Sequence, residues 1–260
     1  MRNARRFVFT VIALSTIAPL LQAAALSEGF DDVSTLPGDG WLQINNSAPL
    51  GDTDWFQGNT GIFPAQAGPE DSYIAANFVN AQDGGDISNW LILPELLLDN
   101  ATQLSFYTRT EIESIFPDRL EVRLSTAGAS TDVGTTASTV GDFSTLLLTV
   151  NPTLDPFGYP SEWTQFTVLL SSLPGPTSGR LAFRYFVPDT LEFGNYIGID
   201  TVAVTPVPEP SCLALATCAM AWLLVSRRRR RPVKGSADFH SVISPTARSD
   251  RATTRSAPRA

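Results

Sequence analysis

Residues 179–187 read Gly-Arg-Leu-Ala-Phe-Arg-Tyr-Phe-Val, in which every second side chain is large and apolar. Successive side chains of a strand point to opposite faces, so this alternation predicts a β-strand with one buried face. Residues 119–125 repeat the pattern, and we expect Arg119, Glu121 and Arg123 on a face exposed to water. Four further segments are predicted to be strands: 103–108, 143–150, 164–170 and 195–204.

The segments between these strands are rich in proline, which argues against long helices. Eleven prolines lie between residues 49 and 188, and proline interrupts a helix interior. About nine to eleven short strands at this length favour an all-β fold, which we interpret as a two-sheet, jelly-roll-like β-sandwich over residues 26–205. With about 180 residues, such a domain buries enough surface to fold without covalent staples.

The charge distribution limits the partners of this domain. Residues 26–206 contain 5 arginines, no lysine and 23 acidic residues, a balance of -18. Nucleic acids and other phosphate-rich partners need a cationic surface, so we expect none of them here.

Several kinds of catalytic site are also excluded. The only histidine, His240, and both cysteines, Cys212 and Cys218, lie C-terminal to the predicted domain. The domain therefore has no Ser-His-Asp triad, no Cys-His pair, no histidine-bearing zinc site and no disulfide. We expect that the protein is not an enzyme.

The N-terminus has the order of a secretory signal peptide. Arginines precede the 15-residue apolar run 7–21, and small residues follow it. We predict a signal peptide over residues 1–25, with Ala23 and Ala25 at the cleavage site. The alternative is a retained anchor, but the run is shorter than the ~20 residues that span a bilayer.

A second targeting signal is predicted near the C-terminus, over residues 206–231. A Pro-rich motif at 207–211 precedes an apolar span at 212–226, and a basic cluster at 227–231 follows. The positive-inside rule keeps such a cluster in the cytoplasm, so the preceding domain faces outward. The motif and cluster residues are Val207, Pro208, Glu209, Pro210, Ser211, Arg227, Arg228, Arg229, Arg230 and Arg231.

This arrangement resembles the PEP-CTERM sorting signal of Gram-negative bacteria. The resemblance implies an exosortase-type sorting protease as a partner, transient anchoring in the inner membrane by one transmembrane helix, and cleavage near 208–211. Residues 232–260 are a departure from it, since such signals usually end soon after the arginines, and we expect them to form a disordered cytoplasmic tail. The alternative is a permanent single-span membrane protein.

The predicted domain itself resembles the choice-of-anchor J family of exported β-sandwiches and, more distantly, cleaved adhesin and MAM-like jelly rolls. That family has no established catalytic activity, so the resemblance implies fold, export and surface location. It also implies that the first and last strands lie side by side. The matching segments are Glu28–Phe30, Leu36–Pro37, Gly40–Trp41, Trp55–Phe56, Ser72–Phe78, Ser88–Pro94, Asp118–Ser125, Trp163–Leu169 and Tyr196–Thr201.

One metal site is predicted from the supply of ligands. Calcium prefers six to eight oxygen ligands, and acidic side chains occur near both ends of the domain. If the first and last strands are neighbours, these carboxylates come close together, and they would hold one structural calcium ion. The candidate ligands are Glu28, Asp31, Asp32 and Asp200, with Asp52 and Asp54 as a second and weaker pair. The alternative is a set of solvated acids that keep the surface soluble.

Two kinds of carbohydrate site remain open. Trp55 and Phe56 lie in a Gly- and Asp-rich stretch and are the aromatic residues that we expect to be exposed, where they would stack on a sugar, whereas Trp90 is expected in the core. Glu111 and Glu113 have a spacing that suits a glycosidase pair if they lie on a strand, but solvated loop residues are the stronger interpretation.

Together these features predict an exported, non-catalytic protein of the cell surface or extracellular matrix. Its role is binding or structural, and extracellular polysaccharide is a candidate partner. The alternative is a carbohydrate-binding or carbohydrate-active domain that acts on extracellular polysaccharide.

Overall fold

The computed structural model describes residues 26–207, which form thirteen strands and two short 3-10 helices. The six strands predicted from alternation all occur. The additional strands have two to four residues, except for β6, which has 12 and was not among the six. The elements are β1 (Leu26–Glu28), η1 (Val33–Asp39), β2 (Leu42–Asn45), β3 (Ala48–Leu50), β4 (Phe56–Gln57), β5 (Ile74–Asn77), η2 (Phe78–Asn80), β6 (Ala81–Ile92), β7 (Leu96–Leu98), β8 (Thr102–Thr110), β9 (Leu120–Ser125), β10 (Thr145–Val150), β11 (Thr164–Leu169), β12 (Thr177–Val187) and β13 (Tyr196–Pro206).

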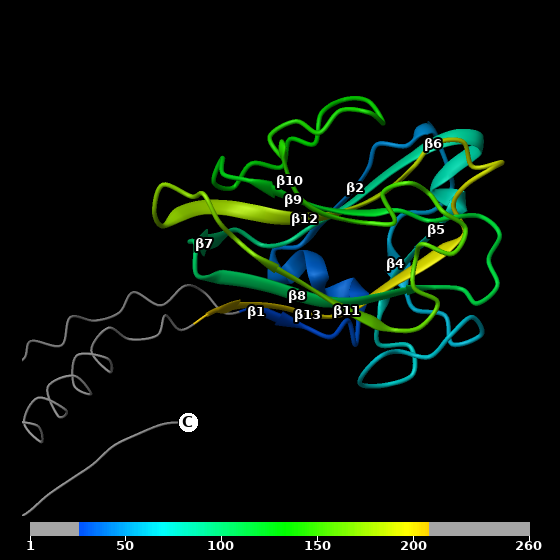
Figure 1. The fold of residues 1–260 in the computed structure, drawn as a ribbon, viewed down its shortest axis with the longest axis horizontal. Coiled ribbons are helices and arrows are strands. Elements are labelled where there is room, and N and C mark those ends of the chain that lie inside the picture. The colour runs from blue at the N-terminus through cyan, green and yellow to red at the C-terminus, as the bar shows by residue number, and fades with distance from the viewer. Residues whose placement is uncertain (1–25, 208–260) are drawn as a thin grey trace, which may run out of the picture. The chain divides into compact units, whose positions relative to one another are not determined.

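The strands form two antiparallel sheets that pack face to face (Figure 1). Sheet A has the order β11-β8-β13-β5-β4, and β1 pairs with β13. Sheet B has the order β10-β9-β12-β6-β2, with β3 paired to β6 and β7 paired to β12. The all-β, jelly-roll-like sandwich predicted from the sequence is therefore confirmed.

The core between the sheets follows from the alternation in the sequence. Leu181, Phe183 and Tyr185 of β12 are fully buried and belong to one large apolar cluster. Phe183 meets Phe106 of sheet A edge to face, with ring centroids 4.8 Å apart. The side chains that period-two alternation assigns to one face thus fill the space between the two sheets.

The outer face of sheet B differs from the expectation. Glu121 is 7% exposed and Arg184 is 1% exposed, although alternation places them away from the core. The long connection between β9 and β10, residues 126–144, folds back over this face, and Val133 and Phe143 pack there against Trp90. The prediction that Glu121 is exposed to water is therefore wrong, because residues 126–144 cover this face of the sheet with a second apolar layer.

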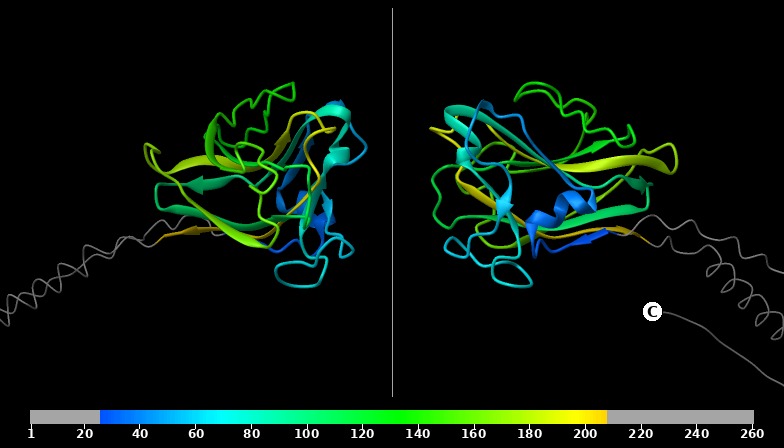
Figure 2. Two further views of the ribbon diagram at one scale, coloured as in Figure 1. Left: turned by 45° about the vertical axis from the view of Figure 1, so that its right-hand side comes forward. Right: turned by 180° about the vertical axis from the view of Figure 1, so that it is seen from behind.

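Both ends of the described domain lie at one pole of the sandwich, the terminal pole. Leu26 of β1 is opposite Val204 of β13, and Pro206 is opposite Thr102. The predicted adjacency of the first and last strands is therefore confirmed, and Figure 2 shows them side by side from two further directions. The connections 111–119, 151–163 and 188–195 lie at the opposite end, which we call the loop pole.

Most residues of the two predicted targeting signals lie outside the described part of the chain. This applies to the signal peptide, to Pro208–Ser211, to the apolar span, to the arginine cluster and to the tail. Val207 is described, and its amide donates to the carbonyl of Ala101 at 2.6 Å. Within residues 26–207 there is no helix long and apolar enough to cross a membrane.

Candidate functional site

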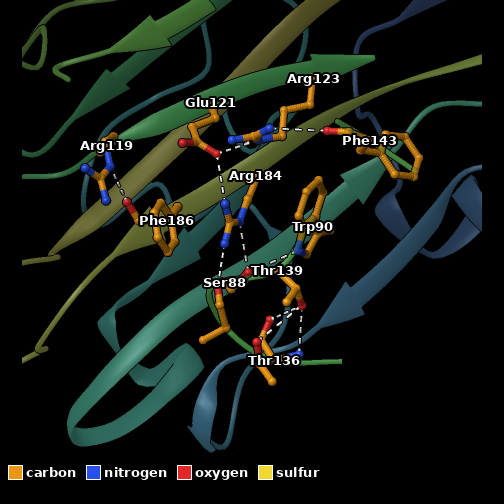
Figure 3. A network of polar contacts seen from close by, with 11 residues as sticks. Ser88, Trp90, Arg119, Glu121, Arg123, Thr136, Thr139, Phe143, Arg184 and Phe186 are labelled. Atoms are coloured by element: carbon orange, nitrogen blue, oxygen red, sulfur yellow. Dashed lines mark hydrogen bonds and ion pairs between the residues drawn. The ribbon is translucent and has the colours of Figure 1, made fainter. Parts of the chain in front are cut away.

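The outer face of sheet B carries a network of charged and aromatic side chains (Figure 3). Arg184 Nη1 donates to Glu121 Oε2 at 3.0 Å, and Arg123 Nε donates to the same oxygen at 2.7 Å. The guanidinium of Arg184 also lies 3.7 Å from the centre of the Phe186 ring and 5.0 Å from that of Trp90. Stacking on two rings and pairing with a carboxylate suits the planar guanidinium group.

This network fastens the covering loop to the sheet. Arg184 donates to the carbonyl of Ala137 in that loop and to Ser88 Oγ, the latter at 2.9 Å. Burial lowers the pKa of Arg184 to about 10, and Glu121 opposes the shift, so the group remains charged at neutral pH. Burial acts to raise the pKa of Glu121, but Arg123 and Arg184 outweigh it and hold that pKa below its usual value. We conclude that the network stabilises the fold and offers no open ligand surface.

A cleft at the edge of the sandwich is the better candidate for a binding site. It lies where η1 and the start of β2 meet the segment 54–57, and its volume is about 650 Å³, within the range of small-ligand sites. Amide and carboxyl side chains line it together with Trp41 and Trp55, which are 1% and 4% exposed. The lining residues are Asp32, Val33, Ser34, Pro37, Trp41, Leu42, Gln43, Asp54, Trp55 and Gln57.

One buried polar atom of this Trp55 cleft has no partner among the described residues. Trp55 Nε1 is a buried donor with no hydrogen-bond partner within residues 26–207. Such an atom gains from a partner, because an unpaired polar atom is costly when it is buried. Asp54 is half-buried and accepts from the amide of Trp55 at 2.8 Å; burial raises its pKa, and hydrogen bonds from Trp55 and Asn89 act against the rise.

The structure separates the two aromatic residues that the sequence paired as a ligand site. Trp55 is 4% exposed, so the expectation that it is exposed is wrong, and Phe56 is half-buried. Neighbours on an extended chain point to opposite sides. Trp55 lines the cleft, whereas Phe56 packs on the outer face of sheet A, 5.9 Å from Tyr196 between ring centroids. Trp90 is fully buried, as predicted.

The four residues of the main predicted calcium site all have partners within the protein. Glu28 Oε1 accepts from the amide of Phe30 at 2.6 Å, and Asp31 Oδ1 accepts from Ser72 Oγ at 2.6 Å. Asp32 Oδ1 accepts from the amide of Ser34 at 3.0 Å and caps η1.

Asp200 is buried on the last strand, away from water. Its Oδ2 accepts from the amides of Gln66 and Ala67 at 2.7 and 3.2 Å. Burial raises its pKa, and these amides act against the rise. Among residues 26–207 no three acidic, histidine or cysteine side chains are grouped as metal ligands, and calcium at these positions stays a prediction.

Glu111 and Glu113 lie in the connection after β8, which ends at Thr110. Glu111 Oε2 accepts from the side-chain amide of Asn195 at 2.9 Å, and Glu113 is exposed with a positive φ of 61°. The two therefore do not share a strand face, which was the geometry that suited a glycosidase pair.

Two glutamines, Gln43 and Gln57, are among the lining residues of the cleft that sequence reasoning missed. Gln43 alternates with Leu42 and Ile44, which pack on the outer face, so it points to the opposite face of β2. Gln57 Nε2 holds the carbonyls of Phe30 and Asp71 at 2.8 and 2.6 Å. Alternation along β2 could have indicated which face Gln43 occupies, but no local pattern indicates that Gln43 or Gln57 lines the same cleft as Trp55.

Several solved structures have a fold similar to that of this chain. No protein-family model matches the sequence, and no curated protein matches it. The structure is similar to the K1 cleaved adhesin domain of Lys-gingipain from Porphyromonas gingivalis W83, with 22% identity, a TM-score of 0.48, and coverage of 71% of this chain and 99% of that one.

Two further solved structures show a similar course of the chain. The K3 cleaved adhesin domain of the same gingipain has 23% identity, a TM-score of 0.45, and coverage of 69% of this chain and 98% of that one. The CBM22-1 xylan-binding domain of Paenibacillus barcinonensis Xyn10C has 14% identity, a TM-score of 0.39, and coverage of 72% and 97%. These are likenesses of fold and carry no ligand over to this chain.

Proposed function

We propose that the protein is an exported, non-catalytic binding or structural protein of the cell surface or extracellular matrix. In this proposal a signal peptide directs export, and an exosortase-type protease sorts and processes the chain through Val207–Ser211. The order of basic, apolar and small residues at the N-terminus supports export, and the order of motif, apolar span and arginines supports sorting.

The observation that carries the proposal is the position of the two chain ends. Leu26 and Val204 pair side by side, so the domain joins both flanking segments through its terminal pole. A tether at that pole, in transit through the inner membrane, leaves the loop pole free to meet partners outside.

Fractionation of the native host tests the sorting part. The change is a triple substitution, Pro208→Ala, Glu209→Ala and Pro210→Ala, and we expect it to leave the protein in the membrane fraction because the protease no longer recognises the motif. A matched control replaces Ser241, Ser244 and Ser249 of the tail with Ala and should reach the same fraction as the unchanged protein. Equal release of all three proteins would contradict sorting through the motif.

A second candidate function is carbohydrate binding in the Trp55 cleft, which the volume and mixed lining of the cleft favour. Neutral polysaccharide is the better candidate than anionic polysaccharide, because the acidic surface repels the latter unless divalent ions bridge the two. Gln43→Ala and Asp54→Asn should weaken binding to an insoluble neutral polysaccharide without changing the fold. The matched control is Gln165→Ala, an exposed residue on β11, and equal retention of the variants and the control would remove this candidate.

A further inference from the structure

The loop pole exposes large apolar side chains. Five of the eleven large apolar residues that are exposed within the described part of the chain lie on its three connections. Phe157 is 90% exposed, Ile115 75% and Leu191 65%, and Ile112 and Phe116 complete the set. Single exposed apolar residues are normal, but a group of them at one end of a domain indicates an interaction surface.

Buried hydrogen bonds hold the three connections together. The carboxylate of Asp118 accepts from Tyr185 Oη at 2.6 Å, from Thr110 Oγ1 at 2.5 Å and from the amide of Asn195 at 2.7 Å. The carbonyl of Asp118 accepts from Asn151 Nδ2 at 2.9 Å. One buried residue thus links 111–119, 151–163 and 188–195, and the apolar tips are presented from a common base. A surface that is already ordered loses less entropy when it binds.

The charge around these tips is predominantly negative. The carboxylates of Glu111, Glu113, Asp155, Asp189 and Glu192 lie on the same connections, exposed or half-exposed. The one arginine on these connections, Arg119, is half-buried, and its guanidinium lies 4.5 Å from the centre of the Phe186 ring. The loop pole is therefore apolar at its tips and anionic around them.

We propose that the loop pole docks a partner protein whose contact surface is apolar and bordered by lysine or arginine. Charge complementarity selects this occupant, because opposite charges steer the encounter and like charges reject the wrong partner. A second copy of this domain, an anionic lipid surface and a nucleic acid would all meet repulsion. The proposal rests on the proposed function in one respect, namely that the pole faces the outside of the cell.

Binding by the immobilised full chain tests the proposal. The probe is a synthetic amphipathic helical peptide of leucine and lysine, and a second peptide carries glutamate in place of lysine. The pole variant is Ile112→Ser, Ile115→Ser and Phe157→Ser. The control variant is Leu146→Ser and Leu169→Ser, which removes side chains 50% and 55% exposed on β10 and β11.

We expect the pole variant to bind the lysine peptide at least about tenfold more weakly, since central apolar contacts carry most of the energy of an interface. The control should bind within about twofold of the unchanged chain, and added salt should weaken binding. Equal loss in both variants, equal binding of the glutamate peptide, or binding to phosphatidylcholine vesicles alone would overturn the proposal. Melting curves should be alike in all three proteins, since the substituted side chains are exposed.

These outcomes are separable from the sorting test. Loss of peptide binding leaves the distribution between membrane and medium unchanged, whereas loss of sorting changes that distribution and leaves binding by the purified chain intact.

Discussion

The buried pair Glu121–Arg184 leads to a quantitative prediction on stability. Arg184 Nη1 and Glu121 Oε2 are 3.0 Å apart, and the side chains are 1% and 9% exposed. Removing one partner of a buried pair costs about 3–5 kcal/mol, because the other charge is left buried. For Arg184→Met we expect the lower end of that range, about 3 kcal/mol, since Arg123 still pairs with Glu121.

The double variant Glu121→Leu and Arg184→Met separates pairing from packing. Replacing both charges with apolar groups is often close to neutral, but the carbonyl of Ala137 then loses its donor, which costs about 1–3 kcal/mol. We therefore expect the double variant to lose about 1–3 kcal/mol, well below the sum of the single losses.

Urea denaturation of the unchanged protein, both single variants and the double variant measures these free energies of unfolding. Since Glu121→Leu also removes one partner and should cost about 3–5 kcal/mol, the sum of the single losses exceeds the loss of the double variant by at least about 3 kcal/mol, which is the expected coupling. Additive losses would refute the reasoning, because they would mean that the two side chains act independently of each other.

Three further predictions concern the stability of the domain. Burial raises the pKa values of Asp54, Asp118 and Asp200 above 3.8, so their ionisation opposes folding as the pH rises. The Tm should therefore increase as the pH falls from 7 through these raised pKa values. The pKa of Glu121 is lowered in the folded protein, so its ionised carboxylate stabilises the fold above pH 4.5. This stabilisation is lost as the pH falls through the lowered pKa, so the Tm should fall again in stronger acid. A Tm that declines steadily from pH 7 would contradict this prediction. Gly198→Ala would place a Cβ 2.8–3.0 Å from three aromatic rings, and we expect a loss of about 1–3 kcal/mol in thermal melts, whereas an unchanged Tm would show that the rings have room. For the predicted calcium site, EDTA should lower the Tm and added calcium restore it, since an ion that binds only the folded state stabilises it; a melt insensitive to both would remove the site.

The strands and the core could be predicted from the sequence because their signal is local. Alternation along 179–187 and 119–125 placed β12 and β9 correctly, and the side chains of Leu181 and Phe183 fill the core as expected. Pairing of β1 with β13 was implied by resemblance to known jelly rolls, and no local pattern in either strand indicates it.

The environment of Glu121 and of Trp55 could not be predicted in the same way. Alternation assigns Glu121 to the face away from the core, but only the path of residues 126–144 decides whether that face meets water. Trp55 lies in a stretch whose composition is typical of exposed loops, and it is buried in the apolar cluster that also holds Leu36 and Trp41. Both failures arise because no local pattern shows which other segment packs against the residue.

The intact mass and terminal peptides of the protein from its native host test the central claim most directly. The account predicts a released species that begins near Leu26 and ends within Pro208–Ser211. A membrane-bound species that still carries Arg227–Ala260 would contradict it and would identify a permanent single-span protein.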